Sequence, residues 1–301
     1  MKSSILVIGS SNTDMVIKAP HLPAPGETIL GGIFLMNPGG KGANQAVAAA
    51  RLGGTVTFIC KTGNDIFGKQ SALLFKEEGI DTSFMLEDPL QPSGVALITV
   101  DDNAENCIVV ASGANAYLNP QDLVPATHCI ENAAIILMQL EIPIETVAYV
   151  ASVAAFPGKK FILNPAPVCI LSDELLKHVS IITPNETEAS MLTGIQVTDE
   201  ISAELAARYL NAKGIATVII TLGSKGALVL HEDECTLVHA PVVQALDTTA
   251  AGDVFNGALA VALSENKTMA AAVEFACKAA AISVTRLGAQ ASAPYKDELS
   301  Y

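Results

Sequence analysis

A carboxylate that follows a turn of small residues is the strongest chemical signal in the chain. The turn precedes an apolar stretch of helical composition at 254–263 and reads Asp247-Thr248-Thr249-Ala250-Ala251-Gly252-Asp253. Small residues allow several backbone N–H groups to point one way, and the start of the helix adds partial positive charge. This suits an anion, or negative charge that develops during a reaction. Asp253 is then a candidate general base; the alternative is that it only caps the helix.

A glycine-rich segment is the second signal, and it reads Pro38-Gly39-Gly40-Lys41-Gly42-Ala43-Asn44-Gln45. Gly39 and Gly40 let the backbone approach a ligand closely, and Lys41 and Asn44 offer hydrogen-bond donors. The segment does not match the glycine pattern of dinucleotide-binding turns. It is not a P-loop either, because the lysine is followed by glycine instead of Ser or Thr. The alternative is a glycine turn that opens an alanine-rich helix.

Three further polar segments each follow a predicted strand. They are Gly9-Ser10-Ser11-Asn12-Thr13-Asp14, Thr183-Pro184-Asn185-Glu186-Thr187-Glu188 and Thr221-Leu222-Gly223-Ser224-Lys225-Gly226. Asn12 and Asp14 can bind hydroxyl groups, which suits a sugar, although a plain polar turn is the alternative. Glu186 and Glu188 can equally favour the start of a helix. The third segment has the composition of an ordinary turn.

The elements that would position these segments alternate along the chain. Short apolar runs predict buried strands at 5–8, 55–60, 135–140, 161–163, 181–183 and 217–221. Helical spacing of Ala, Leu and Val predicts helices at 43–51, 69–78, 144–156, 186–192, 202–212, 254–263 and 269–284. This alternation indicates an α/β fold with a mainly parallel sheet. Such sheets bind ligands at the carboxyl ends of their strands, and the residue types there suggest phosphoryl transfer from a nucleotide to a hydroxyl group.

Two segments do not fit the central sheet. Residues 14–34 contain prolines and glycines between short β-prone pieces, and residues 93–110 resemble two strands around a polar turn. A small β flap over one end of the domain would explain both segments. Ordinary surface hairpins would explain them equally well.

Composition excludes several classes of partner. The chain has 301 residues, with 17 Lys and Arg against 31 Asp and Glu, so its formal net charge is −14. Nucleic acid and anionic membranes are disfavoured, because affinity for either depends on clustered basic residues. The six cysteines lack metal-binding spacing, and no apolar run has the length of a signal peptide or a membrane span. We therefore expect a cytoplasmic protein that contacts neither nucleic acid nor membrane.

Taken together, the segments resemble the ribokinase-type carbohydrate kinase family, over about residues 5–292. The glycine-rich segment and the segment that ends at Asp253 match the two signatures of that family. Further matching stretches are Asn164-Pro165-Ala166-Pro167, Pro184-Asn185-Glu186-Thr187-Glu188 and Thr285-Arg286-Leu287-Gly288-Ala289-Gln290.

The resemblance implies one α/β domain over 1–301, with three α/β/α layers, a mainly parallel central sheet and a small β-sheet lid. The lid would be formed by about residues 12–36 and 93–110. The implied reaction is transfer of the γ-phosphoryl group of ATP to the 5-hydroxyl of D-ribose. Asp253 would take the hydroxyl proton, and the backbone amides of Ala251, Gly252 and Asp253 would stabilise the transferring group. A homodimer formed through the lid is also implied.

Binding residues follow from the same resemblance. Those implied for the sugar are Asn12, Asp14, Gly40, Lys41, Asn44, Glu141 and Asp253. Those implied for ATP are Asn185, Thr221, Gly223, Ser224, Gly226, Gly252 and Cys277. A potassium-type monovalent-cation site is implied at Asp247, Thr249, Ser283, Arg286, Gly288 and Ser292. Glu188 is implied for Mg²⁺, while Cys277 departs from the family, in which His or Asn often lies beside the adenine.

Two alternatives to ribose phosphorylation follow from these residues. One is a kinase for another acceptor, such as deoxyribose or a nucleoside, although Asn12 favours ribose because deoxyribose-specific relatives tend to be apolar there. The other is a sugar-binding regulator without catalysis. That alternative requires a broken signature at Gly252 and Asp253, or an added DNA-binding segment, and the sequence contains neither.

Overall fold

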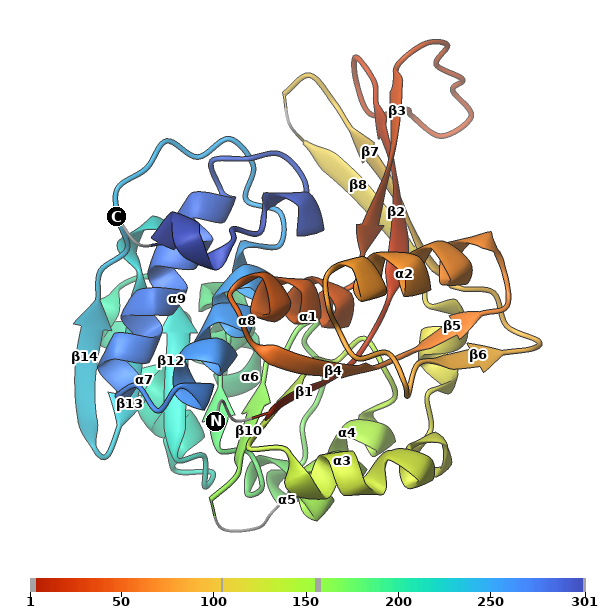
Figure 1. Cartoon of the computed structure of the whole chain (residues 1–301). Helices are drawn as coiled ribbons and strands as arrows, with labels where there is room; N and C mark the ends of the chain where they lie inside the picture. The colour runs from red at the N-terminus through yellow and green to blue at the C-terminus, as the bar shows by residue number, and fades with distance from the viewer. Residues whose placement is uncertain (1–3, 104, 155–157, 300–301) are drawn as a thin grey trace.

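A computed structural model describes residues 4–103, 105–154 and 158–299. Within them, the central sheet has eight strands in the order β14-β13-β12-β11-β10-β9-β1-β4 (Figure 1). Neighbouring strands from β12 to β4 are parallel, whereas β13 and β14 add an antiparallel edge. The strands are β1 (Ser4–Ile8), β4 (Thr55–Ile59), β9 (Ile135–Met138), β10 (Lys160–Leu163), β11 (Ile181–Ile182), β12 (Thr217–Thr221), β13 (Ala227–His231) and β14 (Glu234–Val238).

Helices cover both faces of this sheet, so the molecule has the expected three layers. Side chains of β1 alternate between two buried clusters, with Ile5 and Val7 in one and Leu6 and Ile8 in the other. The first cluster also contains residues of α1 (Lys41–Arg51), α2 (Ile66–Glu77), α8 (Ala251–Ser264) and α9 (Met269–Ser283). The second contains residues of α3 (Thr127–Asn132), α4 (Ile144–Val153), α5 (Asp173–Leu176), α6 (Glu186–Thr193) and α7 (Glu200–Asn211).

Each predicted strand and helix of the alternating pattern is present, with ends that differ by a few residues. The predicted helix at 144–156 ends at Val153, and its positions 155 and 156 lie outside the described residues. The β13–β14 hairpin was not predicted. Its turn uses Glu232 and Asp233 with positive φ, and Glu at such a position lacks the usual glycine or asparagine signal.

The two segments that do not fit the central sheet form one separate sheet. Its strands are β2 (Asn12–Lys18), β3 (Ile33–Gly39), β7 (Gly94–Val100) and β8 (Asn106–Ala111), in the order β3-β2-β7-β8. Parallel pairing of β2 with β7 joins the two segments, so they are not independent hairpins. This small sheet projects beyond the helical layers (Figure 1).

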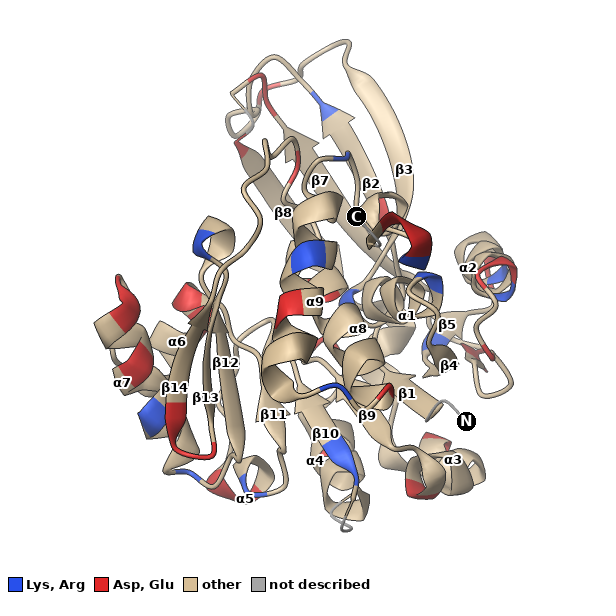
Figure 2. Ribbon diagram, turned by 60° about the vertical axis from the view of Figure 1, so that its left-hand side comes forward, with Lys and Arg blue, Asp and Glu red and all other residues tan. Residues whose placement is uncertain are grey.

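Charged residues concentrate on helices and loops, as Figure 2 shows. Strands β3, β7 and β8 of the small sheet contain none. A minor parallel pair, β5 (Lys61–Gly63) with β6 (Leu86–Asp88), lies beside α2 in Figure 1. Across the described ranges, no helix combines the length and apolarity needed to span a bilayer.

Candidate active site

The predicted site residues meet at the carboxyl ends of the parallel strands. Asn12 and Asp14 follow β1, Glu141 follows β9, Asn185 follows β11, and Thr221 ends β12. Strand order reverses next to β1, because β4 lies on one side and β9 on the other. Open α/β sheets bind ligands at such a reversal, so the fold brings these separate polar segments to one crevice.

Asp253 lies in the first turn of α8 with only 5% of its surface exposed. Its two carboxylate oxygens accept hydrogen bonds from Asn44 Nδ2 and Gln45 Nε2, each at 2.9 Å. The N-cap of α8 is Ala250, and no side chain caps the helix. The capping alternative for Asp253 is therefore wrong. Burial raises the pKa of Asp253, against the opposing effect of Lys41 and the two amide donors.

The backbone before Asp253 leaves donors for a ligand. Ala250 has a left-handed φ of 59°, and the Ala251 amide donates to the Thr248 carbonyl at 3.2 Å. Within the described residues, the amides of Gly252 and Asp253 have no acceptor. A Cβ added to Gly252 would meet no heavy atom within 4 Å, so this position borders open space. Two unpaired amides at the start of a helix are suited to bind negative charge.

The residues that the family resemblance implies for the sugar include a cluster of carboxylates around Lys41. Glu141 Oε2 accepts from Ser10 Oγ at 2.5 Å and from the Lys41 amide at 3.0 Å. Burial raises the pKa of Asp14 to about 6, with further contributions from the charges of Glu141 and Asp253. Burial alone would lower the pKa of Lys41, but the carboxylates around it raise that pKa. The ammonium group therefore stays charged among these acids.

Two adjoining cavities lie at the start of α8, and Asp253 lines the smaller one. One of about 170 Å³ is lined by residues that include Lys41, Asn185, Glu188 and Asp253. A second of about 460 Å³ contains the other residues implied for ATP: Thr221, Gly223, Ser224, Gly226, Gly252 and Cys277. Both cavities share Thr221, Thr248, Ala251 and Gly252 as a wall. Burial and Glu274 raise the pKa of the Cys277 thiol to about 11, so Cys277 offers a neutral surface.

Asn185 and Glu188 form a reciprocal cap at the start of α6. Asn185 Oδ1 accepts from the Glu188 amide at 2.8 Å, and Glu188 Oε2 accepts from the Asn185 amide at 2.9 Å. The prediction that this acidic residue favours a helix start is confirmed. Burial also raises the pKa of Glu188, which lines the smaller cavity. The described residues contain no group of three or more His, Cys, Asp and Glu side chains arranged to hold a metal ion.

The residues implied for a monovalent cation occupy two connected loops. Asp247 accepts from the Thr249 amide and hydroxyl at 2.9 and 2.6 Å, and from the Gly288 amide at 2.8 Å. Although burial opposes it, these donors lower the pKa of Asp247. The hydroxyls of Ser283 and Ser292 each donate to a carbonyl three residues earlier, and Arg286 pairs with Glu298. Backbone carbonyls are thus the groups that remain for an ion.

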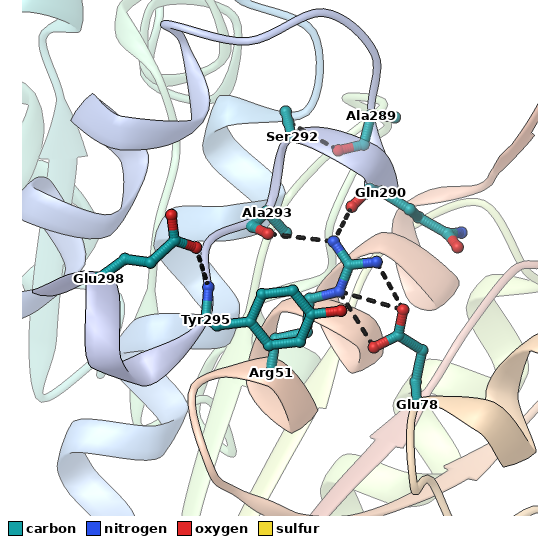
Figure 3. A network of polar contacts seen from close by, with 8 residues as sticks. All are labelled: Arg51, Glu78, Ala289, Gln290, Ser292, Ala293, Tyr295 and Glu298. Carbon is teal, nitrogen blue, oxygen red and sulfur yellow. Dashed lines mark hydrogen bonds and ion pairs between the residues drawn. The ribbon is translucent and has the colours of Figure 1, made fainter.

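Arg51 holds the second of these loops against the end of α1 (Figure 3). Its guanidinium makes an ion pair with Glu78 at 2.5 Å and donates to the carbonyls of Gln290 and Ala293 at 2.6 and 3.0 Å. The ring of Tyr295 lies 5.0 Å from the guanidinium carbon. These contacts fix the short 3₁₀ turn η4 (Gln290–Ser292), which includes Ser292.

Sequence reasoning missed several buried polar residues of the site. Gln45 Nε2 also donates to Asn164 Oδ1 at 3.0 Å, and Gln139 Nε2 donates to Gln45 Oε1 at 2.5 Å. Asn115 Nδ2 donates to Asn12 Oδ1 at 2.8 Å. Gln45 and Asn164 lie in the segments that carry the family resemblance, so their polarity at predicted buried positions was a usable signal. Asn115 had none.

Comparison with known proteins decides the family. The model of the pfkB family of carbohydrate kinases matches residues 2–296. The chain belongs to this family. Family membership confirms the expected resemblance, and the fold described above confirms the predicted α/β class.

Individual family members are similar over nearly their whole length. The ribokinase of Haemophilus influenzae is 48% identical, with 99% of this chain and 97% of that protein covered. The deoxyribokinase of Salmonella typhi is 38% identical, with 96% and 95% covered. The structure of Arabidopsis thaliana ribokinase complexed with ribose and ATP has a TM-score of 0.93 at 32% identity, with 99% and 98% covered.

Proposed function

We propose that this chain is an enzyme that transfers the γ-phosphoryl group of ATP to the 5-hydroxyl of D-ribose, giving D-ribose 5-phosphate and ADP. The observation that carries the proposal is the position of Asp253. Its buried carboxylate lies beside two unpaired amides and lines a polar cavity, which shares a wall with a larger, mostly apolar one. The Haemophilus relative is a ribokinase, and the Arabidopsis structure contains ribose and ATP, which supports this pair of substrates.

In this mechanism Asp253 is the general base. The 5-oxygen of ribose attacks the γ-phosphorus, and its proton passes to the Asp253 carboxylate. The bond from the γ-phosphorus to the bridging oxygen breaks, and ADP leaves with the electron pair. The raised pKa of Asp253 favours acceptance of that proton. The amides of Gly252 and Asp253 stabilise charge on the transferring group, while the Ala251 amide already binds Thr248.

Sugar and nucleotide take opposite sides of Asp253. The sugar is held by Asn12, Asp14, Gly40, Lys41, Asn44 and Glu141, which supply both donors and acceptors for hydroxyl groups. The nucleotide phosphates lie near Asn185 and Gly252. Its base occupies the larger cavity, where Thr221, Gly223, Ser224, Gly226 and Cys277 lie.

Mg²⁺ would be bound through the ATP phosphates and Glu188. The residues fit, because Mg²⁺ typically takes one or two carboxylates together with substrate phosphates. Glu188 lines the cavity next to Asp253, and only one of its oxygens is used by the Asn185 amide. A bound ion would supply positive charge to offset the phosphates beside Glu188 and Asp253, the two acidic residues that line this cavity.

A monovalent cation such as K⁺ would occupy the loops around Asp247. The chemistry fits, since K⁺ is readily coordinated by backbone carbonyl oxygens and the local side chains of Ser283, Arg286 and Ser292 are engaged elsewhere. Asp247, Thr249 and Gly288 are joined by hydrogen bonds, so an ion there would order the turn that leads to Asp253.

The small sheet would act as a lid and as a dimer interface. Two of its strands begin or end beside residues assigned to the sugar, because β2 starts at Asn12 and β3 ends at Gly39, next to Gly40. Large apolar side chains are exposed on β3 and β8, including Phe34 and Val109. We place the enzyme in the cytoplasm, since all six cysteines are free thiols.

The deciding experiment uses the variant Asp253→Asn. A coupled assay measures the ADP formed from ATP in the presence of ribose, with and without potassium. We expect ribose binding by calorimetry to persist while turnover falls by about 10²–10⁴-fold. The control is Asp233→Asn, in the exposed turn of the β13–β14 hairpin. Near-normal turnover of Asp253→Asn would refute the assignment of the base.

Deoxyribose is the second candidate acceptor, because a relative of 38% identity is a deoxyribokinase. Asn12 opposes it, since a buried amide placed to bind a hydroxyl is left unpaired by a sugar that lacks one. A higher kcat/KM for deoxyribose than for ribose, in a panel of pentoses, hexoses and nucleosides, would make deoxyribose the substrate.

A further inference from the structure

Asn115 lies outside every segment considered for the site, in the 3₁₀ turn η1 (Gly113–Tyr117) that follows β8. It is 1% exposed, and the hydrogen bonds of its side chain go to two residues, Ser11 and Asn12. Its Oδ1 accepts from the Ser11 amide at 2.9 Å, and its Nδ2 donates to the Ser11 carbonyl at 3.1 Å and to Asn12 Oδ1 at 2.8 Å. The Ser11 peptide thus fixes which way the Asn115 carboxamide points.

The orientation of Asn115 fixes that of Asn12. Asn12 has one acceptor and one NH₂ group, and the acceptor is taken by the Asn115 donor. If the carboxamide of Asn12 flipped, its NH₂ group would face the NH₂ group of Asn115. In the described part of the chain, Asn12 Nδ2 donates to no residue, so a donor is left for a ligand.

Backbone packs closely against this pair of side chains. Gly94 is the β7 partner of Asn12. A Cβ added to Gly94 would lie 2.1 Å from Asn12 Oδ1 and 2.3 Å from Asn115 Nδ2. The backbone at Gly94 therefore lies directly against both side chains.

We propose that Asn115 is a positioning residue that makes Asn12 a hydrogen-bond donor toward a hydroxyl of the sugar, and that it thereby sets the preference for ribose over 2-deoxyribose. This inference rests on the proposed function, in which Asn12 binds the sugar. A hydroxyl oxygen accepts the Asn12 donor, whereas the deoxy sugar leaves that donor unpaired in a nearly buried position.

The test is Asn115→Asp, which keeps the size and the acceptor for the Ser11 amide but removes the donor. The new carboxylate faces Asn12, so Asn12 turns its NH₂ group inward and its oxygen toward the sugar. We expect KM for ribose to rise about tenfold or more and kcat to change little. We also expect the ratio of kcat/KM for ribose to that for 2-deoxyribose to fall about tenfold. An unchanged ratio would overturn the inference.

Three further variants separate the possible outcomes. Asn211→Asp removes a matched Asn donor, to the Ile215 carbonyl at 2.8 Å, and should leave the sugar ratio unchanged. If Asn115→Asp does not fold, Asn115→Ala takes its place, because it frees Asn12 to turn and should also lower the ratio. If Asn12→Ala leaves ribose binding intact, the proposed sugar role of Asn12 fails. If Asn12→Ala lowers the ratio and both Asn115 variants do not, only the role of Asn115 fails.

Discussion

Asp14 is buried beside other carboxylates, and its ionisation therefore lowers the stability of the folded protein. Its pKa in the folded protein is about 6, against an ordinary value of 3.8, because burial and then Glu141 and Asp253 disfavour its charge. Between these two values the folded state binds the proton more tightly than the unfolded chain does. The contribution of Asp14 is therefore most favourable below pH 4 and is lost as the pH rises through about 6.

Asp14→Asn should stabilise the sugar-free protein at pH 8 by up to about 3 kcal/mol, since one pKa unit corresponds to about 1.4 kcal/mol. The gain should shrink toward zero below pH 4, and ribose affinity should be lost. Urea unfolding at several pH values measures the gain. Asp199→Asn, at an exposed helix N-cap where Asn serves equally well, should show none. Equal unfolding free energies for Asp14→Asn and wild type at pH 8 would contradict the prediction.

At the residue scale, side chains inside recognisable segments were predicted better than the buried amides outside them. Lys41, Asn44 and Asp253 belong to segments whose glycines or small residues indicated a ligand. Gln139 and Asn115 lie in sequence segments without a recognised ligand-binding pattern. They reach the site only because the fold brings distant strand ends side by side. Contacts across about a hundred residues leave no periodic trace in one sequence.

Among the elements, η4 depends on one side chain. Arg51→Ala removes the ion pair with Glu78 and leaves the carbonyls of Gln290 and Ala293 without their donor. We expect a loss of about 3–5 kcal/mol, because an unpaired charge remains in a mostly buried place. Glu78→Gln should cost less, since Arg51 keeps both carbonyls. Hydrogen exchange of residues 288–293 should accelerate only in Arg51→Ala. Equal losses for both variants, with unchanged exchange, would be inconsistent with this role.

The small sheet should respond to the sugar. If it is a lid, ribose binding should slow hydrogen exchange of the amides of β7 and β8, because closure would bury this sheet over the crevice. The β13–β14 hairpin, at the far edge of the central sheet, is the internal control and should not change. Identical exchange of β7 and β8 with and without ribose would rule out a lid.

The fold at the element level was largely predictable, because strands buried on both faces are nearly continuous apolar runs. The pairing of β2 with β7 was not. Neither strand is a continuous buried run, and nothing local in either sequence indicates that its partner lies about eighty residues away.

For the whole molecule, the exposed apolar strands of the small sheet predict self-association. Phe34 is 59% exposed and Val109 is 63% exposed, on strands without charged residues. The double variant Phe34→Asp, Val109→Lys should sediment as a monomer where the wild type sediments as a dimer. Ile170→Asp, at a residue 96% exposed elsewhere, should leave the dimer intact. A wild-type protein that is monomeric at micromolar concentration would refute the interface.

The close approach of backbone to Asn12 and Asp14 also limits how this enzyme can evolve. A Cβ on Gly39 would lie 2.2 Å from the Asp14 carboxylate, just as one on Gly94 would strike Asn12. Gly39 and Gly94 therefore offer no small first step toward another sugar, because enlarging either glycine displaces the residue that it touches. Under the proposed function, a lineage that changes acceptor would exchange Asn12, Asp14 or the positioning residue Asn115 instead of either glycine, and each such substitution would alter the chemistry of the pocket at once.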